Sequence, residues 1–249
     1  MKFDERLALC EALRLGILLE ELSLAAHRGL VIFDFDGVLV DSELLAARGY
    51  KSVFDEVGLE IPAGIMDDAI GLKQDDIFAR IEAEVGRPIP AEVSERLWVR
   101  TREIFEAELE STAGLRDFLD HLTHARCIAS SSDIERIRFS LRVTGLERYF
   151  GDAVFSTHLV THGKPAPDIF LYASRRMGVE PARCVVIEDS EPGVRGAVAA
   201  GMRAIGFLGG AHIREGHGET LREAGADFLA ANWTEVARLL ASEDLLASS

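Results

Sequence analysis

The sequence of 249 residues predicts an α/β protein with a three-layer core, in which helices cover both faces of a parallel sheet, and an inserted all-α helical cap. Two observations predict this fold class. Short apolar runs alternate with helical patterns along most of the chain, which is typical of βαβ units. Residues 43–110 have a helical pattern throughout and interrupt the alternation after the first strand. We therefore expect a core of residues 29–42 and 113–249, a helical cap of residues 43–112 and an N-terminal helical extension of residues 1–28.

The N-terminal extension has apolar residues at near-helical spacing, namely Leu7, Cys10, Leu13, Ile17 and Leu18. We interpret it as a helix packed on the body of the protein. A helix that contacts a partner and a start codon placed too far upstream are the alternatives. Charged residues interrupt its apolar run and no clear small-residue cleavage site follows, so the pattern is not that of a signal peptide.

Six short runs rich in β-branched and aromatic residues predict buried strands of a parallel sheet. These runs lie at residues 30–33, 127–129, 153–155, 184–187, 204–207 and 227–229. The helical patterns of the core lie at residues 114–124, 133–143, 167–177, 192–200, 217–225 and 233–241. This order of elements predicts helices on both faces of the sheet.

The inserted region contains three helical patterns. The first ends at Gly58, the second ends at Gly86, and the third follows Pro90. Two chain crossings, near residues 43 and 112, would connect this cap to the core.

Composition narrows the class of protein. With 27 basic and 42 acidic residues the formal net charge is −15, which argues against a nucleic-acid partner and against binding to an anionic membrane surface. Three scattered cysteines are too few for a disulfide framework or a zinc site and fit a reducing compartment. No stretch reaches the roughly 18 apolar residues that span a bilayer. We expect a soluble cytoplasmic protein with a small-molecule partner; whether it is a monomer or a homodimer stays open.

Acidic residues follow two of the predicted strands, at the edge where an open parallel sheet binds its ligands. Asp34 and Asp36 come directly after the first apolar run, and Gly37 allows a sharp backbone turn beside them. Asp is also common at helix starts, but two acids after a wholly apolar strand are costly unless a cation lies nearby. Glu188 and Asp189 follow the fourth run. Because these acids have no neighbouring Cys or His, they predict a Mg²⁺ site.

Two further segments carry residues that suit a phosphate. Ser130, Ser131 and Ser132 follow the second apolar run, where hydroxyl and N–H groups can hold a phosphate, although the same residues also make an ordinary helix start. Lys164 lies in the segment 163–168, whose prolines restrict the backbone around it. A lysine held near the acidic residues would offset their negative charge.

Together these four segments resemble the motifs of the haloacid dehalogenase-like superfamily. Their sequences are DFDGVLVDSE (34–43), ASSSD (129–133), GKPAPDIF (163–170) and VIEDSEPGVRGAVAAGM (186–202). Their order and spacing match, and the helical insertion lies between the first two, as in members with a small helical cap. The resemblance covers residues 29–240 and implies a Rossmann-like core.

By position, the resemblance implies phosphoryl chemistry at the two acids of the first motif. Asp34 would be the nucleophile that forms an aspartyl-phosphate. Asp36 would protonate the leaving oxygen and then take a proton from the attacking water. Dehalogenase members lack this second acid, whereas phosphate-transferring members keep it.

The resemblance also implies which residues bind the cofactor and the phosphate. The Mg²⁺ ligands would be Asp34, the backbone carbonyl of Asp36, and Asp189, with Glu188 ligating directly or through water. The phosphate-binding set would be Asp34, Phe35, Asp36, Ser130, Ser131 and Lys164, with backbone N–H groups supplied by Phe35 and Asp36. Ser130 and Lys164 would also count among the catalytic residues.

Two phosphoryl activities stay open, namely hydrolysis, as in sugar-phosphate phosphatases, and the phosphotransfer of a β-phosphoglucomutase. The mutase has a cap His where this chain has Ala46, and a cap Arg where this chain has Gln74. Both departures favour a phosphatase that acts on a small phosphorylated metabolite, such as a sugar or polyol phosphate. Phosphonate hydrolysis needs a Schiff-base lysine in the cap, and no clear pattern surrounds Lys51 or Lys73. A binding protein on a decayed enzyme fold is disfavoured because every catalytic residue type is present.

Substrate selection would lie in the cap, which closes over the pocket in such enzymes. Glu43, Lys73 and Gln74 are the candidate substrate-contacting residues near the mouth, although a solvated surface position is the simpler interpretation of each. The loop that ends at His212 could touch the mouth of the pocket, but we assign His212 no role.

Overall fold

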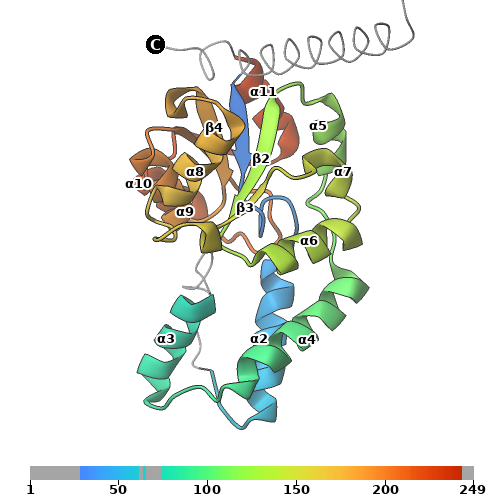
Figure 1. Ribbon diagram of the computed structural model, residues 1–249, viewed down its shortest axis with the longest axis vertical. Helices are drawn as coiled ribbons and strands as arrows, with labels where there is room; N and C mark the ends of the chain where they lie inside the picture. Colours follow the sequence, from blue (N-terminus) through green and yellow to red (C-terminus); the bar gives the residue numbers. More distant parts are fainter. Residues whose placement is uncertain (1–28, 62–63, 66–73, 243–249) are drawn as a thin grey trace, which may run out of the picture.

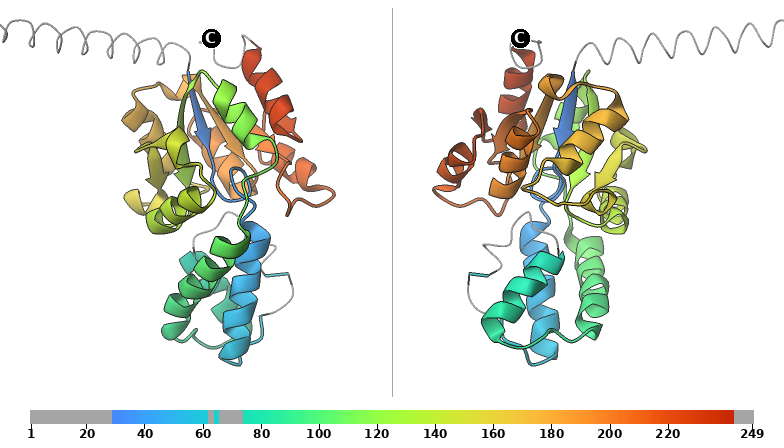
Figure 2. Two further views of the ribbon diagram at one scale, coloured as in Figure 1. Left: turned by 90° about the vertical axis from the view of Figure 1, so that its right-hand side faces the viewer. Right: turned by 60° about the vertical axis from the view of Figure 1, so that its left-hand side comes forward.

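The structure is a computed structural model, and it describes residues 29–61, 64–65 and 74–242. The predicted N-terminal helix of residues 1–28 and the candidate Lys73 lie outside the described residues. Figure 1 and Figure 2 show an α/β core with a smaller helical region at one end of its sheet. In the described part of the chain, no helix is long and apolar enough to cross a membrane.

Six strands form one parallel sheet in the order β3-β2-β1-β4-β5-β6. The strands are β1 (Leu30–Phe33), β2 (Ala125–Ser130), β3 (Val154–Ser156), β4 (Cys184–Glu188), β5 (Arg203–Phe207) and β6 (Phe228–Ala230). The central strand β1 places Phe33 beside Ile128 of β2 and Ile187 of β4. The residues that follow these three positions therefore leave the sheet at the same edge, as the sequence predicts.

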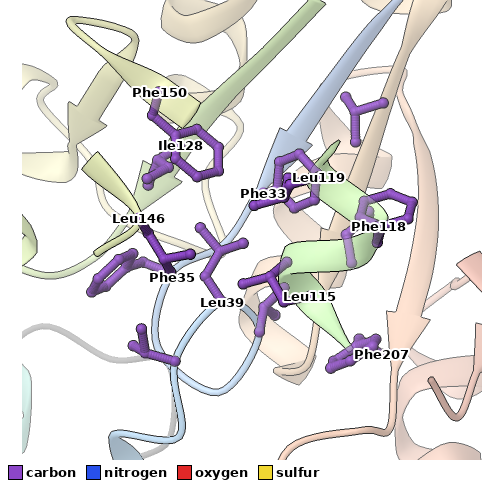
Figure 3. Close-up of a cluster of buried hydrophobic side chains, with 14 of the residues drawn as sticks. Phe33, Phe35, Leu39, Leu115, Phe118, Leu119, Ile128, Leu146, Phe150 and Phe207 are labelled. Atoms are coloured by element: carbon purple, nitrogen blue, oxygen red, sulfur yellow. The ribbon is translucent and has the colours of Figure 1, made fainter. Parts of the chain in front are cut away.

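Helices cover both faces of the sheet, which confirms the predicted fold class. Phe33 packs on one face with α5 (Leu115–His121), α6 (Ile134–Val143), α7 (Glu147–Phe150) and α11 (Trp233–Ala241), and Figure 3 shows part of this cluster. Ile32 packs on the other face with α8 (Asp168–Met177), α9 (Glu191–Ala199) and α10 (His217–Glu223). Because successive residues of β1 point to opposite faces and both faces are buried, the strand is apolar without interruption.

A few core elements differ from the prediction. The short helix α7 and two 3₁₀ turns, η2 (Thr157–Leu159) and η3 (Pro181–Arg183), were not predicted. Strand β2 begins at Ala125, two residues before the predicted run. Its Arg126 is accommodated because the guanidinium donates to the carbonyls of Leu119 and Leu122, each at 2.8 Å.

Between β1 and α5, the described residues form the helices α2 (Glu43–Glu56), α3 (Gln74–Val85) and α4 (Glu92–Glu108). They share a hydrophobic cluster of their own, which includes Tyr50, Phe54, Ile81 and Leu97. Ala46, Phe105 and Leu109 instead pack with the core, at the ends of α2 and α4 nearest the sheet. The cap boundaries of residues 43 and 112 stay a prediction.

The two chain crossings to the helical region run side by side. The N–H of Asp41 donates to the carbonyl of Glu110 at 3.1 Å, and the N–H of Thr112 donates to the carbonyl of Leu39 at 3.1 Å. The helical region is therefore joined to the core by a short paired connection, which places it over the carboxyl ends of the strands.

Candidate active site

The acids and the serine predicted as site residues gather where β1, β2 and β4 end. The N–H of Asp34 donates to the carbonyl of Ile187 at 2.9 Å, so the chain keeps its register with β4 for one residue beyond the strand. A cavity of ≈ 830 Å³ opens here. Its lining includes Asp34, Asp36 and Ser130 from the core and Glu43 and Gln74 from the helical region. The candidate site therefore lies between the two parts of the molecule.

Lys164 joins two of the acids. Its Nζ donates to Asp34 Oδ1 and to Glu188 Oε1, each at 2.6 Å, and all three side chains are buried. Burial alone would lower the pKa of Lys164, but the charges of Asp34 and Glu188 outweigh it and raise that pKa. The other oxygen of Glu188 accepts hydrogen bonds from the N–H and hydroxyl of Ser190, at 3.0 and 2.9 Å. The lysine is thus a fixed cation inside the acidic cluster.

Three carboxylates share this small buried space. Oxygens of Asp34, Glu188 and Asp189 lie within 4.8 Å of one another. Burial, together with the charges of its acidic neighbours, raises the pKa of Asp34 well above its ordinary value, against the opposing effect of Lys164. Burial and the charge of Glu188 do the same to the pKa of Asp189, whose Oδ2 is buried and makes no hydrogen bond. One lysine leaves this cluster with excess negative charge, so the donor set fits a divalent cation.

Two glycines allow these acids to approach the backbone. Gly37 has φ +76°, and a Cβ built there would lie 1.9 Å from Asp189 Oδ2. A Cβ at Gly193, in the first turn of α9, would lie 1.8 Å from Glu188 Oε1. Any larger residue at either position would displace an acidic side chain of the cluster.

Asp36 has a separate set of partners. Its Oδ1 accepts from Ser42 Oγ at 2.5 Å and from Arg136 Nη2 at 2.8 Å, and its Oδ2 accepts from Ser132 Oγ at 2.6 Å. Burial would raise the pKa of Asp36, but Arg136 and the hydroxyl donors outweigh it and hold that pKa below its ordinary value. The carboxylate of Asp36 is not in the group of acids that could hold a metal. The atom of Asp36 that was predicted to bind Mg²⁺ is its backbone carbonyl, and this stays a prediction.

The predicted phosphate-binding residues lie at this edge of the sheet. Ser130 is buried, lines the cavity, and accepts a hydrogen bond from the N–H of Ser132 at 3.0 Å. Ser131 also lines the cavity. The side chain of Phe35 is buried in the hydrophobic core, as Figure 3 shows, so its predicted contribution could come only from its backbone. Contact of these residues with a phosphate stays a prediction.

Two of the three predicted substrate-contacting residues line the cavity. Glu43 begins α2, and burial, aided by the charges of Asp36 and Asp189, raises its pKa to about 7. Gln74 begins α3, and its Nε2 donates to Ser94 Oγ of α4 at 2.9 Å.

Two histidines contact Asp189, and neither was predicted as a site residue. His212 Nε2 lies 3.0 Å from Asp189 Oδ2, although neither atom makes a hydrogen bond. His217 Nε2 lies 2.5 Å from the backbone oxygen of Asp189. Both come from the segment after β5, and burial lowers the pKa of His212. This segment therefore packs directly on an acid of the cluster.

Comparisons with known proteins agree with this site. The family model of haloacid dehalogenase-like hydrolases matches residues 29–201. The 6-phosphogluconate phosphatase of Escherichia coli is 28% identical over 184 residues, which cover 73% of this chain and 83% of that protein. The phosphorylated carbohydrates phosphatase of Thermotoga maritima is 32% identical over 200 residues, which cover 79% of this chain and 91% of that protein. The crystal structure of a conserved haloacid dehalogenase-like protein of Agrobacterium tumefaciens superposes with a TM-score of 0.73 at 35% identity, covering 86% of this chain and 98% of that one.

The family model covers more than half of the chain, three of the four motifs lie at the ends of β1, β2 and β4, and the fourth supplies Lys164 to the same acidic cluster. The chain belongs to the haloacid dehalogenase-like hydrolases.

Proposed function

We propose that the protein is a Mg²⁺-dependent phosphatase that hydrolyses a small phosphorylated metabolite, a sugar or polyol phosphate, through an aspartyl-phosphate. The observation that carries this proposal is the buried ion pairing of Lys164 with both Asp34 and Glu188. Beside it, Asp36 is paired with a different cation, Arg136. Such an arrangement supplies a nucleophile, a fixed positive charge for phosphoryl oxygens and a separate acid–base group.

In the first step, a carboxylate oxygen of Asp34 attacks phosphorus while the bond from phosphorus to the leaving oxygen breaks. Asp36 must first take up a proton, because its hydrogen-bond donors favour its carboxylate form, and it gives this proton to the leaving oxygen, which departs as an alcohol. In the second step, Asp36 takes a proton from a water whose oxygen attacks the same phosphorus. The bond from phosphorus to Asp34 breaks, phosphate leaves, and Asp36 again carries the proton for the next cycle.

Asp34 and Asp189 would hold Mg²⁺ directly. Asp189 Oδ2 makes no hydrogen bond, whereas both oxygens of Glu188 already accept hydrogen bonds from Lys164 and Ser190. Bound there, Mg²⁺ would offset the negative charge of the phosphate and of the acidic cluster. Ser130 and Lys164 would hold the phosphoryl oxygens in place.

Ala46 and Gln74, the two cap positions at which a mutase has other residues, do not favour the phosphotransferase alternative. Ala46, at the position of the mutase histidine, is buried and packs with the hydrophobic core. Gln74, at the position of the mutase arginine, is an uncharged amide bonded to Ser94. Gln74 has no positive charge to bind the distal phosphate of a mutase substrate. Ala46 has no group that could transfer a proton to or from a sugar hydroxyl.

The substrate class is proposed from the relatives and the cavity. The two relatives described above are a 6-phosphogluconate phosphatase and a phosphorylated carbohydrates phosphatase. Glu43, Tyr50, Gln74 and Ser94 line the cavity on the side of the helical region. These side chains offer hydrogen-bonding groups for a hydroxyl-rich substrate.

The test is release of inorganic phosphate from a panel of metabolites, with Mg²⁺ or with EDTA. The panel contains 6-phosphogluconate, fructose 1-phosphate, a hexitol phosphate, and β-glucose 1-phosphate with its 6-phosphate isomer. We expect Mg²⁺-dependent release from at least one of them, and a loss of at least about 10²-fold for Asp34→Asn, which keeps the shape of the side chain but removes the nucleophile. Interconversion of the two glucose phosphates without net release would instead identify a phosphotransferase. Full activity of Asp34→Asn would contradict the covalent intermediate.

A further inference from the structure

Arg136 contacts both the candidate acid–base residue and a helix of the cap region. It lies in the first turn of α6, lines the cavity, and donates from Nη2 to Asp36 Oδ1 at 2.8 Å. The centre of its guanidinium lies 5.2 Å from the ring centroid of Phe105, on α4. The side chain is 22% exposed and that of Asp36 is 11% exposed, so the pair is largely screened from water.

Asp36 is held by donors from three separate segments. Ser42 precedes α2, Ser132 follows β2, and Arg136 lies on α6. Together they occupy both carboxylate oxygens, so the side chain has a fixed orientation. Of these donors only Arg136 is charged, and a charge-assisted hydrogen bond is roughly twice as strong as a neutral one.

The cation beside the candidate nucleophile Asp34 is a different residue. Lys164 pairs with Asp34 and Glu188. The two aspartates of the first motif therefore each have a different cation. This division separates the nucleophile from the group that moves protons.

We propose that Arg136 is a positioning residue for Asp36, holding its carboxylate where it serves both proton transfers. The inference rests on the proposed function. Because the guanidinium also packs on Phe105, it ties the orientation of Asp36 to α4 of the cap region. A phosphate-binding role would instead place Arg136 in direct contact with the substrate, and a purely structural role would affect every substrate alike.

The experiment compares two phosphate esters that differ in their need for an acid. The alkoxide of a sugar phosphate needs a proton as it leaves, whereas the nitrophenolate of p-nitrophenyl phosphate leaves without one. The second step, attack of water, needs a base with either ester. The variants are Arg136→Gln and Arg136→Lys, assayed on p-nitrophenyl phosphate and on the panel sugar phosphate that the wild type hydrolyses fastest.

For Arg136→Gln we expect kcat on the sugar phosphate to fall by about 10²-fold, with little change in KM and no burst. On p-nitrophenyl phosphate the same variant should release one equivalent of nitrophenolate in a burst and then turn over slowly, because the phospho-enzyme forms but is hydrolysed poorly. Arg136→Lys, which keeps the charge and a donor, should recover part of the loss. Arg138→Gln is the matched control, because Arg138 lies two residues further along α6 and contacts the carbonyl of Gly151 and the carboxylate of Asp152.

Three results would overturn the inference. An equal loss in Arg136→Gln on both esters without a burst would show a structural role, and a raised KM with unchanged kcat would show substrate binding. Unchanged kinetics would show that Asp36 does not need this partner. If the wild type hydrolyses neither ester, the proposed function fails and the inference with it, whereas any of the three results beside an active wild type refutes the inference alone.

Discussion

At the scale of single residues, the position of Asp189 in the acidic cluster depends on the absence of a side chain at Gly37. Substituting Gly37 by Ala would put a Cβ 1.9 Å from Asp189 Oδ2, at a backbone φ of +76°. Since the acid must then move, we expect the Mg²⁺ concentration for half-maximal activity to rise by about 10–100-fold, the range seen when a metal ligand loses its support. Titration of phosphate release with Mg²⁺ measures this.

The matched control for Gly37→Ala is Gly178→Ala. Gly178 has φ +69° and no atom within 4 Å of the built Cβ, so it carries the same backbone strain of about 1–2 kcal/mol without the collision. Gly178→Ala should lower stability and leave the Mg²⁺ requirement unchanged. An equal change of the Mg²⁺ requirement in both variants would mean that strain alone, and not the contact with Asp189, explains the effect.

Sequence reasoning at this scale finds the residues that directly follow strands and misses those that reach the site from elsewhere. Asp34 and Glu188 were predicted because parallel strands end at one edge of the sheet. Arg136, His212 and His217 were not, because their places depend on how α6 and the segment after β5 fold back over that edge. For Arg136 a signal was present: it lies in the first turn of the helix that starts right after the serine segment.

At the scale of elements, one threonine links the second crossing to the core. Thr112 Oγ1 donates to the carbonyl of Val38 at 2.8 Å and accepts from Trp233 Nε1 at 2.9 Å. Thr112→Val keeps the shape but leaves two buried polar groups unpaired, so we expect the free energy of unfolding to fall by about 1–3 kcal/mol for each. Urea denaturation followed by tryptophan fluorescence measures this.

The control for Thr112→Val is Thr234→Val, at an exposed position of α11, which should stay within about 0.5 kcal/mol of the wild type. Equal stability of the two variants would contradict a structural link through Thr112.

Long periodic elements were predictable, and short ones were not. The helical patterns at 133–143 and 233–241 correspond to α6 and α11 almost residue for residue. The helix α7 has four residues, which are too few to show a helical period. Its Phe150 packs on Phe33 of the sheet, with ring centroids 5.8 Å apart. Such elements follow from tertiary packing and not from local pattern.

At the scale of the whole molecule, the alternation of strands and helices predicts a parallel sheet but not its order. The order β3-β2-β1-β4-β5-β6 puts β1 between β2, which ends at Ser130, and β4, which ends at Glu188, so the two acids after β1 leave the sheet between these strand ends. Apolar runs do not encode which strand becomes central, because each is buried on both faces. The strand order therefore follows from the structure and was not predicted.

The charge balance of the whole site leads to the last prediction, which concerns stability and pH. The pKa values of Asp34 and Asp189 are raised in the folded protein, above the ordinary value of about 3.9. As pH rises from about 4, the folded state therefore holds more protons than the unfolded state, and the free energy of unfolding without Mg²⁺ falls. Mg²⁺ needs the ionised carboxylates, so its stabilising effect should grow over the same rise in pH, reaching about 2.7 kcal/mol at a hundredfold excess over its Kd.

Thermal unfolding with Mg²⁺ or EDTA, at about pH 5 and about pH 8, tests this linkage. We expect the Mg²⁺-induced rise in Tm to be larger at the higher pH. Asp189→Asn, which removes one buried charge and one ligand, should raise Tm in EDTA at the higher pH and abolish most of the Mg²⁺ effect. A Mg²⁺ effect that is the same at both pH values, or that survives in Asp189→Asn, would place the ion elsewhere, because only binding at the buried carboxylates competes with their protons.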